Sequence, residues 1–153
     1  MWEPEEIDKV RELLRRMIGT PYAMGYQGEK DWVVRGKPHI DDKDPKEFDC
    51  SGLSRWIIAQ GICRNGLRIV LPHGTIEQLK ACIPIARPPR ALDLGFADMD
   101  GSGQPDHVII AYSSQIAIEA RGKPFNKVIE RPISKWESWP KFLGWWAVGG
   151  VHQ

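Results

Sequence analysis

The stretch on which the fold depends is Phe48-Asp49-Cys50-Ser51-Gly52-Leu53-Ser54-Arg55-Trp56-Ile57-Ile58. A charged segment interrupted by prolines ends at Asp49, and an apolar run that can form a helix begins at Ser51. Cys50 is therefore expected where a helix starts, and the unpaired N–H groups and the dipole of a helix favour negative charge there. A thiol in this position is biased toward thiolate, whereas an arbitrary cysteine is more often a small buried residue.

The composition restricts the class of protein before any motif is considered. With 153 residues the chain is predicted to form a single domain, residues 1–153. The net charge of +1 and the dispersed Lys and Arg residues predict no nucleic-acid partner, and the lack of a long apolar run predicts no membrane insertion. An odd number of cysteines argues against a disulfide framework, and the start Met1-Trp2-Glu3-Pro4-Glu5-Glu6 does not resemble a signal peptide. The sequence thus predicts a protein made in the cytoplasm with free thiols, without a cofactor.

Helical patterns come first in the chain, and strand patterns follow. Helices are predicted over residues 4–18 within an N-terminal helical segment 1–18, over residues 51–62 and over residues 75–80. The polar stretch 26–47 is predicted to be a long loop insertion with a short hairpin near Val33. Strands are predicted over residues 92–97, 107–112, 116–120, 127–133 and 142–148. This order predicts an α+β fold in which N-terminal helices pack on one side of a C-terminal antiparallel β-sheet.

A nucleophilic cysteine needs a base to take its proton and a third group to hold that base. His107 opens a predicted strand and is a candidate for the base. If Ser113–Gln115 form a three-residue hairpin loop, Ile109 pairs with Glu119, and Glu119 becomes a diagonal neighbour of His107 on the same face. A two-residue loop would place Glu119 on the opposite face, and an isolated pair of this kind is more often a surface contact.

Six short motifs follow one another between Gly19 and about Val148. They are Thr20-Pro21-Tyr22, Phe48-Asp49-Cys50-Ser51-Gly52-Leu53, Leu71-Pro72 with Gln78, Asp93-Leu94, Asp106-His107-Val108 and Ile118-Glu119-Ala120. In order and rough spacing they resemble the NlpC family of papain-like cell-wall cysteine endopeptidases. The resemblance implies a papain-like fold, with Cys50 as nucleophile, His107 as general base and Glu119 as the residue that orients the base.

The same resemblance implies where the substrate lies and what it is. Tyr22, Asp49 and Ser51 are expected on the substrate side of the nucleophile, and backbone N–H groups at Cys50 are expected to contribute to an oxyanion hole. The family cuts amide bonds in peptidoglycan stem peptides, commonly between D-glutamate and a diamino acid. Peptidoglycan peptides are therefore the expected substrate.

Peptidoglycan lies outside the cytoplasm, so the expected site of synthesis and the expected substrate are in different compartments. We expect delivery to the cell wall with a phage virion, by lysis or by injection, and a phage or prophage origin with phage tail proteins as further partners. The other expectation is that the protein acts on peptidoglycan fragments that are recycled in the cytosol. Two alternative functions stay open: a non-catalytic structural or binding component of a phage tail that retains the fold, and a thiol amidase that acts on a non-peptidoglycan amide.

The chain departs from the family pattern at several positions. Glu119 stands where the family more often has His, Leu92 stands where it has Gly, and Ile109 replaces a small residue. The connection leading to Cys50 is longer than usual, which predicts an extra flap beside the cleft. These departures concern the substrate preference more than the type of reaction.

Other residues that could bind metal or line the site receive simpler interpretations. The stretch Asp98-Met99-Asp100-Gly101-Ser102-Gly103 resembles the first half of a calcium loop, but Ile109 stands at the closing position, so a plain turn is favoured. No Cys-x-x-Cys pair is present, so no zinc site is expected from Cys50, Cys63, Cys82 and His73. No bound metal is predicted. We expect Trp136, Trp139, Trp145 and Trp146 to pack in the core and at its rim, with one or two at the floor of the substrate groove.

Overall fold

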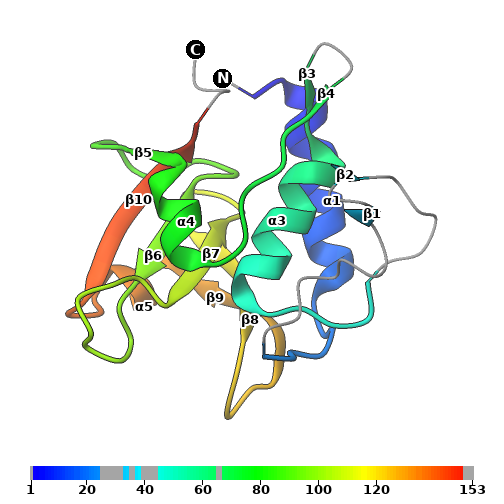
Figure 1. The fold of residues 1–153 in the computed structure, drawn as a ribbon. Helices are drawn as coiled ribbons and strands as arrows, with labels where there is room; N and C mark the ends of the chain where they lie inside the picture. Colours follow the sequence, from blue (N-terminus) through cyan, green and yellow to red (C-terminus); the bar gives the residue numbers. More distant parts are fainter. Residues whose placement is uncertain (1, 25–32, 35–36, 39–44, 65–66, 150–153) are drawn as a thin grey trace.

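The computed structural model describes residues 2–24, 33–34, 37–38, 45–64 and 67–149, and Figure 1 shows their arrangement. The helices are α1 (Pro4–Met17), α3 (Cys50–Gly61), α4 (Thr75–Lys80) and α5 (Ile133–Glu137). The strands are β1 (Val33–Val34), β2 (Lys37–Pro38), β3 (Cys63–Arg64), β4 (Leu67–Arg68), β5 (Cys82–Pro84), β6 (Leu94–Ala97), β7 (His107–Ala111), β8 (Ile116–Arg121), β9 (Lys127–Pro132) and β10 (Phe142–Val148).

Six of these strands form one antiparallel sheet in the order β5-β10-β6-β7-β8-β9. All five predicted strands are present, with ends that differ by one or two residues. The sequence does not predict β5, because prolines are rare in strands. Pro84 is tolerated because β5 lies at the edge of the sheet, where one side of the strand needs no hydrogen-bonded neighbour.

Two short hairpins lie outside this sheet. In the long predicted loop, Val33–Val34 pairs with Lys37–Pro38, which confirms the expected hairpin near Val33. The second hairpin pairs Cys63–Arg64 with Leu67–Arg68 directly after α3. The rest of the 26–44 stretch, with the expected flap, lies outside the described residues.

The two faces of the large sheet carry separate hydrophobic clusters. The larger cluster lies between the sheet and the helices α1 and α3, and its members include Leu14, Ile57 and Ile110. The smaller cluster holds the alternate residue Ile109 together with Trp136 of α5, so α5 covers the opposite face. The prediction that N-terminal helices pack on one side of an antiparallel sheet is confirmed, while α5 is an additional cover that the sequence does not predict.

Helix α1 forms where the sequence predicts it, because both of its ends are stabilised. Pro4 occupies the first turn, and Glu3 and Glu6 form a reciprocal capping box with backbone N–H groups. Arg15 and Arg16 lie in the last turn, where the helix dipole favours positive charge. Its buried face packs along α3 (Figure 1) and consists of Val10, Leu13, Leu14 and Met17.

The turn before β6 contains a residue with an unusual backbone conformation. Leu92 has a φ of 76°, in the left-handed region that favours glycine, and its side chain is 1 % exposed. Its N–H donates to the carbonyl of Ala111 at 2.8 Å, and the next residue, Asp93, binds the Arg87 guanidinium at 2.7 Å. These contacts and the burial of the leucine hold a conformation that is otherwise strained.

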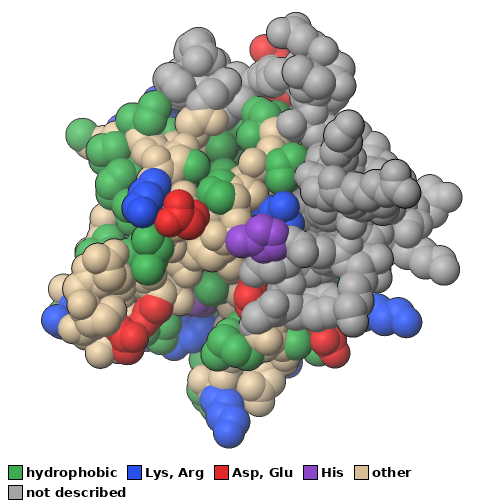
Figure 2. Space-filling view, in the orientation of Figure 1, with side chains coloured by type: hydrophobic (Ala, Val, Ile, Leu, Met, Phe, Trp, Pro, Cys, Tyr) green, Lys and Arg blue, Asp and Glu red, His purple; other side chains and the backbone are tan. Residues whose placement is uncertain are grey.

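The face of the molecule that Figure 2 shows has no area of a single charge among the described residues. On the face that Figure 2 shows, Lys and Arg side chains lie apart from one another among acidic and hydrophobic ones. Exposed hydrophobic residues include Ile76 on α4 and Ile83 on β5, at 40 % and 42 % exposure. Within the described part of the chain, none of the helices combines the length and the hydrophobicity that crossing a bilayer requires.

The closest approach of α1 and α3 gives the first testable prediction. A Cβ atom at Gly61 would overlap Cγ2 of Val10. Gly61→Ala is therefore expected to destabilise the fold by about 1–3 kcal/mol, because overpacking outweighs the helix propensity that alanine adds. Urea unfolding followed by circular dichroism measures the change. The double variant Val10→Ala/Gly61→Ala should be less destabilised than the sum of the two single variants, and simple additivity would contradict the contact.

Candidate active site

Cys50 is the first residue of α3, as the sequence predicts. The helix begins there because Asp49 is its N-cap: the carboxylate accepts a hydrogen bond from the Gly52 N–H at 2.6 Å and from the Ser51 hydroxyl at 3.3 Å. The Cys50 side chain is 9 % exposed, and its Sγ lies 3.9 Å from the carbonyl oxygen of Asp106. The cap thus fixes the thiol beside the first residues of β7.

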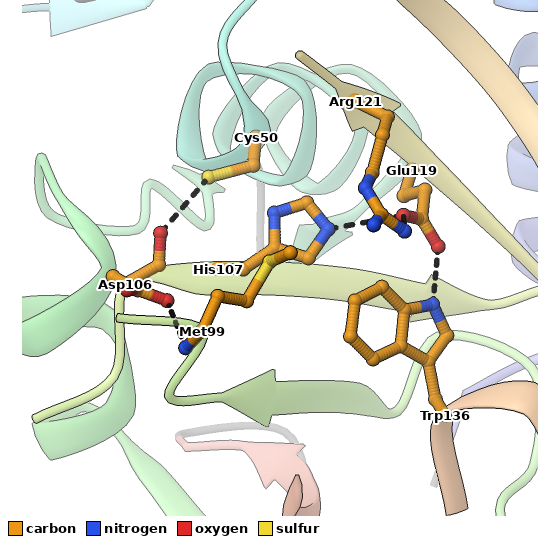
Figure 3. Close-up of polar contacts among 7 residues, drawn as sticks. All are labelled: Cys50, Met99, Asp106, His107, Glu119, Arg121 and Trp136. Carbon is orange, nitrogen blue, oxygen red and sulfur yellow. Dashed lines mark hydrogen bonds and ion pairs between the residues drawn. The ribbon is translucent and has the colours of Figure 1, made fainter. Parts of the chain in front are cut away.

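His107 and Glu119 face each other from neighbouring strands. The pairs Ile110–Ile118 and Ala111–Ala117 fix the register of β7 and β8, and this register makes His107 and Glu119 diagonal neighbours, as the three-residue hairpin loop predicts. His107 Nε2 lies 3.1 Å from Glu119 Oε1. The other ring nitrogen, Nδ1, points toward Cys50 (Figure 3). The imidazole therefore lies between the thiol and the carboxylate.

The electrostatics of this arrangement favour a charged imidazole. Burial acts to lower the pKa of His107, but hydrogen bonds to Cys50 and Glu119 and the negative charges of both outweigh it and raise the pKa to about 9. The imidazole is then imidazolium at neutral pH. A positive charge therefore lies beside the sulfur of Cys50, which is the setting in which a cysteine can act as a nucleophile.

Glu119 is enclosed by three donors and is 1 % exposed. Its Oε1 contacts His107 and also accepts from Arg121 at 3.3 Å, and its Oε2 accepts from the indole N–H of Trp136 (Figure 3). Burial acts to raise the pKa of Glu119, but the hydrogen bond and charge of His107, the hydrogen bond of Trp136 and the charge of Arg121 together lower it below its ordinary value. The carboxylate therefore stays ionised.

The sequence does not identify Arg121 and Trp136 as parts of this site. Arg121 lies two residues after Glu119 on the same strand, so alternation alone could have placed it on the same face. Trp136 gives no such signal, because α5 is five residues long and follows Pro132 without a helical apolar pattern. The expected packing role holds for Trp136, which is 2 % exposed, but its N–H also contacts Glu119.

A cleft of about 550 Å³ opens at Cys50 and His107. The predicted substrate-side residues Tyr22, Asp49 and Ser51 all line it. Burial, with the negative charges of Cys50 and Asp49, raises the pKa of Tyr22, so its hydroxyl remains a hydrogen-bond donor. The other residues of the lining are Met24, Gly74, Thr75, Met99, Asp106, Arg121, Gly122 and Lys123. The structure thus places five of the six predicted site residues in the lining of one cleft, and the sixth, Glu119, lies buried against His107.

The loop 98–106 at the side of this cleft uses its carboxylates to hold its own backbone. Asp98 accepts from the N–H groups of Gly101, Ser102 and Gly103, and Asp106 accepts from those of Met99 and Asp100. These contacts fit the plain turn that the sequence favours. Among the described residues, the aspartates 98, 100 and 106 form the only group of three or more metal-binding side chains, so Cys50, Cys82 and His73 are not gathered into a zinc site.

No protein-family model and no curated protein sequence matches the chain, but solved structures do. An NLP/P60 family protein from Staphylococcus aureus subsp. aureus Mu50, described as similar to lipoprotein, is 22 % identical with a TM-score of 0.68. The match covers 97 % of this chain but 43 % of that one, so this chain spans less than half the length of that protein.

Two single domains match over most of both chains. The NlpC/p60 domain of the peptidoglycan hydrolase SagA is 25 % identical with a TM-score of 0.59, over 84 % of this chain and 91 % of that domain. The P60 domain of an antigen from M. avium subspecies paratuberculosis is 25 % identical with a TM-score of 0.61, over 93 % of each chain. The fold of this chain is the papain-like α+β fold of these neighbours, and they support its assignment to the NlpC/P60 family.

Proposed function

We propose that this chain is a cysteine peptidase that hydrolyses amide bonds in peptidoglycan stem peptides, of the D-glutamyl–diamino acid type. The observation that carries the proposal is the position of Cys50 at a helix N-terminus, facing an imidazole whose pKa is raised to about 9 and which a buried carboxylate holds from behind. A purely structural cysteine needs no such partner.

The proposed reaction has two steps. The Cys50 thiolate attacks the amide carbonyl carbon, and the His107 imidazolium gives its proton to the leaving amine as the C–N bond breaks. His107, now neutral, takes a proton from the water that attacks the thioester carbonyl. The C–S bond then breaks, the acyl group leaves as a carboxylic acid, and the Cys50 thiolate and His107 imidazolium are restored. Backbone N–H groups at the start of α3, with Cys50 among them, are the candidates for stabilising the oxyanion.

The cleft supports a peptide substrate that carries groups of both charges. Two acidic residues, Asp49 and Asp106, and two basic residues, Arg121 and Lys123, are all among its lining. Stem peptides contain both carboxylates and amines, so each sign of charge finds a complementary group. The solved neighbour SagA is named a peptidoglycan hydrolase, which agrees with this substrate class. Association with a phage tail and delivery by a virion, by lysis or by injection stay predictions.

The chemical state of the thiols gives a direct test. Iodoacetamide at pH 7 should alkylate Cys50 faster than Cys82, because the imidazolium beside Cys50 stabilises its thiolate. Burial raises the pKa of Cys82 to about 12, although a hydrogen bond from Gly149 acts to lower it, so Cys82 serves as an internal control. Mass spectrometry of peptides after timed labelling gives the two rates. Equal, slow labelling would instead favour a binding module that retains the fold.

Activity itself is tested with purified muropeptides and mass spectrometry, which reports both hydrolysis and the bond that is cut. The wild-type chain should cleave them, Cys50→Ala should lose all cleavage, and Cys82→Ala should retain it, because Cys82 lies outside the cleft. Cleavage that persists in Cys50→Ala would remove the nucleophile assignment. Cleavage of other amides but of no muropeptide would favour a thiol amidase with a different substrate.

The pH dependence follows from the raised pKa of His107. The value of kcat/KM should fall as pH rises through about 9, because the imidazolium that protonates the leaving amine is lost. His107→Ala should lower kcat by about 10²- to 10⁴-fold. Glu119→Gln should lower it less and move the alkaline fall to lower pH, because an amide supplies no negative charge. A larger loss in Glu119→Gln than in His107→Ala would reverse the assigned roles.

A further inference from the structure

His107 and Glu119 share one neighbour, which lies on the face of the sheet opposite to α1 and α3. Helix α5 places Trp136 on the face that carries His107 and Glu119. The indole ring lies 5.1 Å from the His107 ring, centroid to centroid, with 35° between the ring planes. Its N–H is aimed at Glu119 Oε2, as Figure 3 shows. A single residue thus contacts both the base and the group that orients it.

We propose that Trp136 is a positioning residue for catalysis: its N–H holds the Glu119 carboxylate in the one orientation, and the one charge state, that supports His107. The inference rests on the proposed function only in the role given to the Cys50–His107 pair. The identity of the substrate does not enter it.

A carboxylate can rotate unless both of its oxygens are held. The last torsion of a glutamate side chain has a broad energy profile, so contacts on one oxygen alone do not fix the group. Here both contacts other than Trp136 fall on Oε1: His107 at 3.1 Å and Arg121 at 3.3 Å. Trp136 supplies the contact on Oε2. Without its N–H, Oε2 would lie buried with its hydrogen bond lost, and the carboxylate would rotate or take up a proton.

The surrounding charges show why the ionised form of Glu119 is required. Arg121 and Arg131 lie with their guanidinium carbons 5.0 Å and 5.6 Å from the centre of the Trp136 ring, and His107 adds a third cation when protonated. Cys50 on α3 is the other group that faces His107, and its hydrogen bond and negative charge are among the causes of the raised pKa of His107. A neutral Glu119 would leave the imidazolium among cations, and its proton would be held less tightly.

The test compares Trp136→Phe with Trp139→Phe. Phenylalanine keeps an aromatic ring and removes the N–H. Trp139 is a matched control because its ring lies 6.3 Å from that of Trp136, and it is 39 % exposed. Trp136→Phe should lower kcat by about 10- to 100-fold with KM unchanged, as expected for the loss of one hydrogen bond to a charged group. Trp139→Phe should retain the wild-type values.

Two further measurements need no substrate. NMR titration of the His107 ring should show a midpoint near pH 9 in the wild-type chain and in Trp139→Phe, and about tenfold lower proton affinity in Trp136→Phe.

Urea unfolding should show that the difference in stability between the wild-type chain and Trp136→Phe depends on pH. Because the pKa of folded Glu119 is lowered, its stabilising effect is present above the ordinary value of 4.5 and is lost as pH falls through the folded value. The loss of stability in Trp136→Phe should therefore be larger at pH 7 than in acid.

A loss of stability that is the same at every pH, with the His107 titration unchanged, would assign Trp136 to packing alone and overturn the proposal. If Trp136→Phe does not fold, replacement of Trp136 by benzothienylalanine keeps the shape of the indole and removes only the N–H, and the same outcomes apply. If no muropeptide is cleaved by the wild-type chain but the His107 titration shifts in Trp136→Phe, the proposed function fails and this inference stands.

Discussion

The structure depends on one constraint, which is that the negative charge of Glu119 is buried away from water. Glu119 is ionised and 1 % exposed, and an ionised carboxylate in such surroundings is unstable unless every side of it meets a donor. The donors come from three elements: β7 supplies His107, β8 supplies Arg121, and α5 supplies Trp136. The register of the sheet and the position of α5 therefore both stabilise the Glu119 carboxylate, which in turn holds His107 beside Cys50.

Much of the fold follows from the sequence because local signals agree with the tertiary structure. The apolar periodicity and charged ends of α1, and the apolar run that begins at Ser51, predict α1 and α3 to within a residue. A hairpin loop of three residues fixes which side chains of β7 and β8 share a face, so the His107–Glu119 pair follows once that loop length is chosen over two residues, a choice that the sequence left open. The position of Cys50 at the helix start follows from the same reasoning.

What the sequence could not show depends on contacts between distant segments. Helix α5 is too short for a periodic pattern, and a tryptophan within it has the same local signals as any buried aromatic residue. Strand β5 exists only because β10 returns alongside it, and its proline argues against a strand when neighbours are unknown. Only the structure therefore shows that α5 covers the second face of the sheet and that Trp136 is the third donor to Glu119.

Leu92 has a consequence for how chains of this fold can diverge. The family pattern has glycine at this position, and a φ of 76° explains that preference. Here a leucine adopts a left-handed backbone conformation and offsets the strain by filling the core. A glycine in a family signature can thus be exchanged for a large apolar residue without changing the turn, provided that a pocket receives the side chain. Sequence patterns that insist on the glycine will pass over such chains.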